Sequence, residues 1–103
     1  MSPLLHIDDK KLREFCVRWK ITELALFGSV VRDDFGPDSD VDVLVAFAPE
    51  VRWTLLDHVR MRDELMEVFG RSVDLVTRRA VERSPNYLRR REILGSAQVV
   101  YGS

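Results

Sequence analysis

Three aspartates carry the strongest chemical signal in this sequence. Asp40 and Asp42 flank a valine at the start of an apolar segment, residues 41–47, and Asp74 lies inside the short apolar run 72–77. An ionised carboxylate that is buried without a partner costs several kcal/mol, so these acids need a compensating positive charge. Carboxylate oxygens with no His or Cys nearby favour Mg²⁺ or Mn²⁺ over Zn²⁺. The three acids are therefore predicted to bind divalent metal ions and to form a catalytic centre.

The spacing of the acids indicates which reaction the metals would serve. Side chains alternate along a strand, so Asp40 and Asp42 share one face, and Asp74 joins them if its strand lies alongside. Three converging carboxylates repel one another unless a cation lies between them. In two-metal phosphoryl transfer, one ion lowers the pKa of the attacking hydroxyl and the other stabilises the departing pyrophosphate. The sequence therefore predicts such a site, with the carboxylates as metal ligands.

A triphosphate also needs a binding turn, and the end of the preceding apolar segment supplies one. Gly28 lets the backbone approach phosphate oxygens closely, and Ser29 adds a hydroxyl donor. Residues 30–32 are expected to begin a short helix whose free N–H groups point at the same anion. Arg32 would add a fixed positive charge. Gly28, Ser29 and Arg32 are thus predicted to bind the nucleotide, the alternatives being a simple turn and a solvated surface charge.

The elements that must position these residues follow from the apolar spacing. A first helix is predicted after Asp8 and Asp9, because the following apolar residues recur at helical spacing. Strands are predicted where apolar runs between breakers are too short for a helix, and a loop is predicted at residues 32–39, where Gly, Pro and Asp cluster. The further predicted elements are strands at 21–27, 41–47 and 72–77, helices at 53–69 and 87–94, and a short edge strand at 97–101.

This order predicts an α/β fold of the α+β kind, with a small mixed β-sheet backed by helices and one domain over residues 1–103. The 16 Lys and Arg against 17 Asp and Glu give a net charge of −1, which argues against a general nucleic-acid-binding surface. Cys16 is the only cysteine, so we expect it to pack in the core. No signal peptide and no run of about 20 apolar residues is present. We therefore expect a cytoplasmic protein with no membrane contact.

The same residues resemble a known family signature. Gly28-Ser29, ten intervening residues and then Asp40-Val41-Asp42 resemble the G-S-x10-D-x-D motif of the polymerase-beta-like nucleotidyltransferase superfamily. Residues 26–32, 71–76 and 87–94 resemble its minimal nucleotidyltransferase (MNT) branch. The resemblance implies a palm-like core, with Asp40, Asp42 and Asp74 as metal-binding acids and Gly28-Ser29 as the nucleotide-binding turn. Asp33 departs from the pattern, because relatives commonly have Gly after the arginine.

The resemblance also implies a substrate and a partner. MNT members are typically antitoxins encoded beside a HEPN-domain ribonuclease, and they transfer AMP from ATP to a tyrosine of that toxin. The resemblance thus implies two bound Mg²⁺ ions, which Mn²⁺ could replace. It also implies ATP as the substrate and a HEPN toxin as the partner. A chain this short has little material for an acceptor pocket of its own. The basic run Arg89 to Arg91, with Trp53 or Tyr101, is a candidate docking surface for the partner.

Two other functions remain open at this point. The first is a non-catalytic antitoxin that neutralises its toxin by binding alone. The second keeps the same site but transfers the nucleotide to a small molecule, such as an aminoglycoside, or to an RNA end. His6 and His58 show no partner pattern and are not expected to bind metal.

Overall fold

The computed structural model describes residues 5–32 and 35–102, and these fold around one mixed β-sheet. The strands are β1 (Ile21–Phe27), β2 (Val41–Phe47), β3 (Val73–Thr77) and β4 (Gln98–Tyr101). Their order across the sheet is β3-β2-β1-β4. Strand β1 pairs antiparallel with β2 and β4, whereas β2 pairs parallel with β3. The predicted α/β fold with a small mixed sheet is confirmed; the single domain over residues 1–103 stays a prediction.

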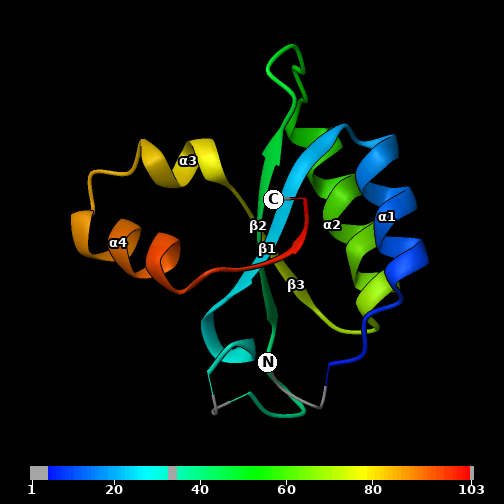
Figure 1. Cartoon of the computed structure of the whole chain (residues 1–103), viewed down its shortest axis with the longest axis horizontal. Coiled ribbons are helices and arrows are strands. Elements are labelled where there is room, and N and C mark those ends of the chain that lie inside the picture. The colour runs from blue at the N-terminus through cyan, green and yellow to red at the C-terminus, as the bar shows by residue number, and fades with distance from the viewer. Residues whose placement is uncertain (1–4, 33–34, 103) are drawn as a thin grey trace.

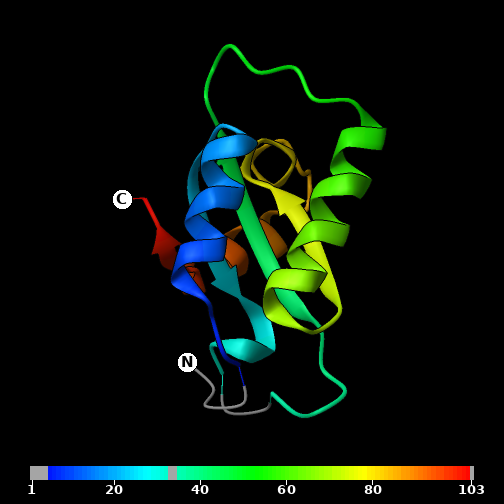
Figure 2. The ribbon, with the colours of Figure 1, turned by 90° about the vertical axis from the view of Figure 1, so that its right-hand side faces the viewer.

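Helices cover both faces of the sheet. Helices α1 (Asp9–Arg18) and α2 (Leu55–Phe69) lie side by side on one face, as Figures 1 and 2 show. Helices α3 (Arg78–Glu82) and α4 (Tyr87–Ser96) lie on the other face (Figure 1). The fold is therefore a three-layer arrangement, with one pair of helices on each side of the sheet.

Local capping explains where the helices begin and end. The Asp8 side chain accepts a hydrogen bond from the backbone N–H of Lys11, which caps α1. Thr54 and Asp57 form a reciprocal capping box, so α2 begins at Leu55, two residues later than predicted. The helix ends at Gly70, whose φ of 68° is left-handed. These polar signals set the helix ends more sharply than the apolar pattern does.

Helix α3 was not predicted from the sequence. The Thr77 side chain accepts a hydrogen bond from the N–H of Ala80, so the chain turns into a helix directly after β3. Within this five-residue element only Val81 is buried. A helix this short has too few apolar positions to show a helical period in the sequence. Helix α4 was predicted, and Asn86 caps its start.

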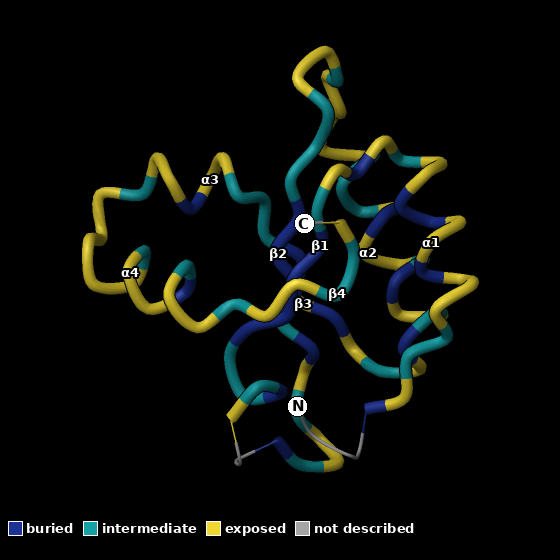
Figure 3. The backbone as a smooth tube through the Cα atoms, in the orientation of Figure 1, coloured by how far each residue is buried: buried dark blue, intermediate teal, exposed yellow. Residues whose placement is uncertain are grey.

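The buried residues are distributed unevenly between the two faces (Figure 3). The face under α1 and α2 holds a large cluster that includes Leu12, Phe15 and Leu65. The face under α3 and α4 holds a smaller cluster around Phe27, Leu44, Val81 and Ile93. Cys16 is buried in the first cluster, as expected. Among the described residues, no helix combines the length and the apolar character needed to cross a membrane.

Candidate active site

The strand register brings two of the three aspartates side by side. Asp42 on β2 is the direct partner of Asp74 on β3. On its other side, Asp42 is the partner of Phe27, the last residue of β1. Asp40 stands one residue before β2 begins and is exposed. The sheet therefore places all three acids at the same end, beside the turn that follows β1.

Asp42 and Asp74 belong to the sheet face that α3 and α4 cover. Val41 and Val43 of β2 point into the cluster under α1 and α2, so Asp42 between them points the opposite way. Its cross-strand partner Phe27 and its strand neighbour Leu44 both lie in the smaller cluster. Asp42 is half-buried, whereas Asp74 is exposed. Asp42 and Asp74 thus lie at one end of the face with the smaller buried cluster.

The electrostatics of this end favour a bound cation. Burial raises the pKa of the Asp42 carboxyl above its ordinary value, and the negative charges of Asp74 and Asp40 raise it further. The positive charges of Arg32 and Arg89 oppose this rise in part. The charges of Asp40 and Asp74 therefore both act on the Asp42 carboxyl. A cation beside these carboxylates would relieve the repulsion.

The donor chemistry fits a hard divalent ion. Carboxylate oxygens are the ligands that Mg²⁺ and Mn²⁺ prefer. Within residues 5–32 and 35–102, no three His, Cys, Asp or Glu side chains are drawn together as a ready-made metal cage. Mutual repulsion is the physical reason for such carboxylates to stay apart without a cation between them. The metal-binding roles of Asp40, Asp42 and Asp74 remain a prediction that this arrangement favours.

Gly28 is required by the local geometry. Its φ is +73°, a left-handed value that glycine adopts without strain. A Cβ atom built at this position would overlap the carboxylate of Asp42. Glycine is therefore the residue that allows the end of β1 to lie directly against the acid. Ser29 follows it and is half-buried.

The turn after β1 differs from the short helix expected at residues 30–32. The chain forms a single 3₁₀ turn, η1 (Gly28–Val30). The N–H groups of Val31 and Arg32 donate to the carbonyl oxygens of Gly28 and Ser29, both at 3.1 Å. These two donors are therefore used inside the turn and do not point at an anion, so this part of the prediction was wrong.

Arg32 lies between the turn and helix α4. Its side chain is exposed, and its guanidinium Nη1 lies 3.5 Å from a carboxylate oxygen of Glu92. Its charge is near enough to Asp42 to lower the pKa of that carboxyl. A nucleotide-binding role for Arg32 stays a prediction. Asp33, where the sequence departs from the family pattern, lies outside the described residues.

The sequence analysis missed the position of Arg89 relative to the acids. Its charge lowers the pKa of Asp42, although the two residues are far apart in the sequence. No spacing rule relates a residue of β2 to a residue of α4. An Arg-rich helix was the sole signal in the sequence, and it does not indicate which arginine faces the acids.

The candidate docking surface is not continuous. Trp53 packs edge-on against Trp19 with ring centroids 5.1 Å apart, and its indole N–H donates to the Trp19 carbonyl at 3.1 Å. Trp19 and Tyr101 pack against the cluster under α1 and α2. The arginines of α4 lie on the other side of the sheet (Figure 1). The aromatic and basic residues therefore belong to two separate surfaces.

The two histidines differ in their surroundings. Nε2 of His58 donates to the backbone carbonyl of Leu75 at 3.1 Å, which ties α2 to β3. His6 is exposed before α1.

Comparison with known proteins places this arrangement in context. The family profile described as "Nucleotidyltransferase domain" matches residues 9–100. The protein adenylyltransferase MntA of Thermococcus cleftensis is 37% identical over 82 residues, which cover 80% of this chain and 78% of that protein. The match to the profile takes in the turn after β1 and all three acids.

Solved structures show the same fold. One, described as a minimal nucleotidyltransferase, has a TM-score of 0.64 and 35% identity, covering 90% of this chain and 96% of that chain. Another contains a tri-AMPylated HEPN toxin of Shewanella oneidensis in complex with an MNT antitoxin. It matches with a TM-score of 0.62 and 18% identity over 92% of this chain and 70% of that chain. At 18% identity the second likeness is one of fold.

Proposed function

The chain belongs to the nucleotidyltransferase domain family and, within it, to the minimal nucleotidyltransferases, and on this basis we propose that it is an antitoxin acting on a HEPN-domain toxin. The reaction would be transfer of AMP from ATP to a tyrosine of that toxin. Family membership makes the chain a nucleotidyltransferase enzyme. The names of two similar proteins support the rest, since one is a protein adenylyltransferase and the other is an MNT antitoxin in complex with an AMPylated HEPN toxin.

The single observation that carries the proposal is the register of the acids. Asp42 and Asp74 are direct neighbours on parallel strands, and Gly28 allows the end of β1 to lie against Asp42. Phosphoryl transfer consists largely of positioning and of charge stabilisation. A rigid sheet end that combines carboxylates with a tight backbone turn offers both.

In this proposal each residue has a defined role. Asp40, Asp42 and Asp74 hold two divalent cations, with Mg²⁺ preferred and Mn²⁺ as a substitute. Bound ions would supply Lewis-acid charge stabilisation at the phosphates. Gly28 and Ser29 bind the triphosphate and Arg32 adds a positive charge. The tyrosine hydroxyl gives up its proton to solvent and its oxygen forms a bond to the α-phosphorus of ATP. The bond from that phosphorus to the pyrophosphate oxygen breaks, and pyrophosphate leaves.

The acceptor is proposed to come from outside the chain. The acids lie at one end of the sheet, where Asp40 and Asp74 are exposed. An exposed acid end suits a segment of a partner protein that carries a tyrosine into it. We place the reaction in the cytoplasm, where ATP and a ribonuclease toxin are both present.

Intact-protein mass spectrometry of the toxin tests this proposal. The HEPN protein encoded beside this chain would be incubated with the enzyme, ATP and Mg²⁺. The expected result is a gain in steps of one AMP, which peptide mapping assigns to tyrosine. The double variant Asp40→Ala/Asp42→Ala should give no gain. Asp38→Ala, an exposed acid in the preceding loop, is the matched control and should act as the wild type.

The same experiment separates the competing functions. A toxin that is silenced in the complex without any gain in mass would overturn AMP transfer and favour neutralisation by binding alone. AMP on the toxin that forms equally well with EDTA present would overturn the metal requirement.

A further inference from the structure

The loop that leads into Asp40 is held by one arginine. Arg71 lies between the end of α2 and the start of β3, far from this loop in the sequence. Its Nη2 donates hydrogen bonds to the backbone carbonyls of Gly36 and Ser39, the second at 3.3 Å. Ser39 is the residue directly before Asp40. One guanidinium group therefore fixes the backbone next to the acid.

The loop forms a closed turn around this contact. The N–H of Gly36 donates to Oγ of Ser39 at 3.0 Å, and the N–H of Ser39 donates to the carbonyl of Gly36 at 3.1 Å. The Arg71 guanidinium lies over the ring of Phe35, with its Cζ 4.3 Å from the ring centroid. Phe35 is buried in the cluster under α1 and α2. Arg71 thus connects the turn to the core of the protein.

The segment around Arg71 also holds the residue that follows Asp40. The N–H of Val41 donates to the carbonyl of Ser72 at 2.9 Å, directly before the pairing of β2 with β3 begins. The residues on both sides of Asp40 are therefore bonded to residues 71 and 72, one to a side chain and the other to the backbone. The Asp40 side chain itself is exposed, so burial does not fix it.

Asp40 needs such support because its charge repels a neighbouring acid. The negative charge of Asp40 helps to raise the pKa of the Asp42 carboxyl. An exposed acid at the end of a loop could move away from that neighbour when no cation lies between them. Fixing its backbone beforehand lowers the conformational entropy that is lost when a cation binds.

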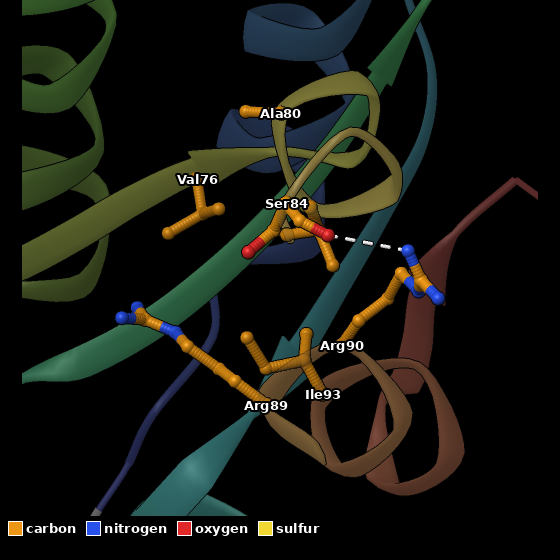
Figure 4. A pocket seen from close by; sticks show the side chains of 7 residues that line it. Val76, Ala80, Ser84, Arg89, Arg90 and Ile93 are labelled. Carbon is orange, nitrogen blue, oxygen red and sulfur yellow. Dashed lines mark hydrogen bonds between the residues drawn. The ribbon is translucent and has the colours of Figure 1, made fainter. Parts of the chain in front are cut away.

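Arg90 uses its guanidinium in the same way elsewhere in the fold. Its Nη1 donates to the backbone carbonyls of Ser84 and Glu82 at 3.2 and 3.4 Å, and Figure 4 shows the first of these bonds. Its guanidinium also lies 5.7 Å from the ring centroid of Tyr87. These contacts hold the connection between α3 and α4, which does not lead into any of the three aspartates. Arg90 is therefore a matched comparison for Arg71.

We propose that Arg71 is a positioning residue, which holds Asp40 where a divalent cation can bind between the three aspartates. The inference rests on the proposed function, since it takes these aspartates to be the cation ligands. Arg71 acts through the backbone of the loop and does not touch the cation or the substrate. Its positive charge by itself opposes cation binding, so charge and positioning predict effects of opposite sign.

Binding of Mn²⁺ alone, followed by electron paramagnetic resonance of the free ion, tests this role without any transfer reaction. Arg71→Met keeps a long side chain over the Phe35 ring but has no donor for the two carbonyls. It is expected to weaken Mn²⁺ binding about 10-fold or more, the usual loss when a group that orients metal ligands is removed. Arg90→Met is the matched control and should not weaken it. Circular dichroism melts confirm that each variant is folded during the titration.

Arg71→Ala gives a second test, because a small cation from solution can take the place of the missing group. Ser39, Asp40 and Arg71 border an open hollow of about 580 Å³, so the guanidinium ion has access to the loop. Millimolar guanidinium chloride, far below the concentrations that unfold proteins, is expected to raise the Mn²⁺ affinity of Arg71→Ala towards that of the wild type. Sodium chloride at the same concentration should not raise it.

Three results would overturn the inference. The first is an Arg71→Met protein that binds Mn²⁺ as tightly as the wild type does, or more tightly, because only the charge of Arg71 would then act on the site. The second is an equal loss in Arg71→Met and Arg90→Met, or an Arg71→Ala protein that guanidinium does not restore, because the loss would then be a general effect on packing. The third is a wild type that does not bind Mn²⁺.

The failure of this inference is distinguishable from the failure of the proposed function. If the variants lose Mn²⁺ affinity as expected but the wild type transfers no AMP to the toxin, the inference stands and the proposed function fails. If the wild type transfers AMP but Arg71→Met keeps its full Mn²⁺ affinity, the proposed function stands and the inference fails.

Discussion

The two faces of the sheet differ in what they enclose. Among the described residues, the cluster under α1 and α2 has seventeen buried members, whereas the cluster under α3 and α4 has five. On the first face, both helices contribute buried side chains to the cluster. The second face carries Asp42 and Asp74 at one end. The difference indicates that one face supplies most of the apolar burial and so allows the other to hold repelling charges.

The largest expected effect comes from removing the Asp42 charge on the face under α3 and α4. Asp42→Asn is expected to lower the rate of AMP transfer about a thousandfold or more, because metal-borne charge stabilisation contributes several kcal/mol. The same variant should have a higher melting temperature at neutral pH, since the repulsion that raises the pKa of Asp42 is gone. Rate measurements on the toxin and thermal melts check the two effects.

The pH dependence of that melting temperature has a defined sign. The folded protein holds the Asp42 proton more tightly than the unfolded chain, so the ionised carboxylate lowers stability as the pH rises through its raised pKa. Below its ordinary value of 3.8 the carboxyl is neutral in both states, and the difference between wild type and Asp42→Asn should vanish. A wild type that melts above Asp42→Asn at neutral pH without metal would contradict the repulsion.

The next effect is the loss of stability when a core side chain under α1 and α2 is truncated. Leu65→Ala removes a fully buried side chain of α2 and should lower the free energy of unfolding by about 2–5 kcal/mol. Ile93→Ala, in the smaller cluster, should cost less, near the lower limit of about 2 kcal/mol, because fewer buried neighbours surround it. Urea titrations of both variants measure the difference. Equal losses would remove the energetic distinction between the two faces.

A pair of glycines gives a smaller effect on stability and a more local test of the acid end. Gly28 and Gly70 have nearly the same left-handed φ, +73° and +68°, but only at Gly28 would a Cβ meet another side chain. Ala at either position carries left-handed strain of about 1–2 kcal/mol. Gly28→Ala should in addition displace Asp42 and abolish AMP transfer, whereas Gly70→Ala should keep it. Loss of transfer in both variants would show that backbone strain alone accounts for the effect.

The smallest expected effect is the labelling of Cys16, which tests whether α1 stays packed on the sheet. Cys16 is fully buried there, and burial raises the pKa of its thiol to about 12. Because the thiolate is the reactive form, native protein at pH 8 should not react with iodoacetamide on the timescale that labels the unfolded chain. Mass spectrometry follows the labelling. Fast labelling of the native protein would mean that α1 opens readily.

The sequence alone predicted most of the helices and strands, and it predicted that Asp40 and Asp42 lie together. The strands β1 and β2 and the pair Asp40 and Asp42 follow from local patterns, because alternation and turn residues act over a few positions. The ends of α2 needed its capping contacts, and α3 is too short to have a readable period. The turn at Gly28 was predicted, but the short helix expected at residues 30–32 is a 3₁₀ turn over Gly28–Val30. The closeness of Gly28 to Asp42 on another strand is not contained in the local sequence.

What only the tertiary structure decided is how distant segments meet. The partnering of Asp42 with Asp74 depends on β3 pairing parallel to β2 in one register, and a shift by one residue would turn Asp74 to the other face. The approach of Arg89 to the acids depends on the packing of α4 against the sheet, as does the separation of Trp53 from the arginines. Sequence periodicity assigns a residue to a face of its own element. The relation between faces of different elements is fixed by the burial of the whole core, which no local pattern contains.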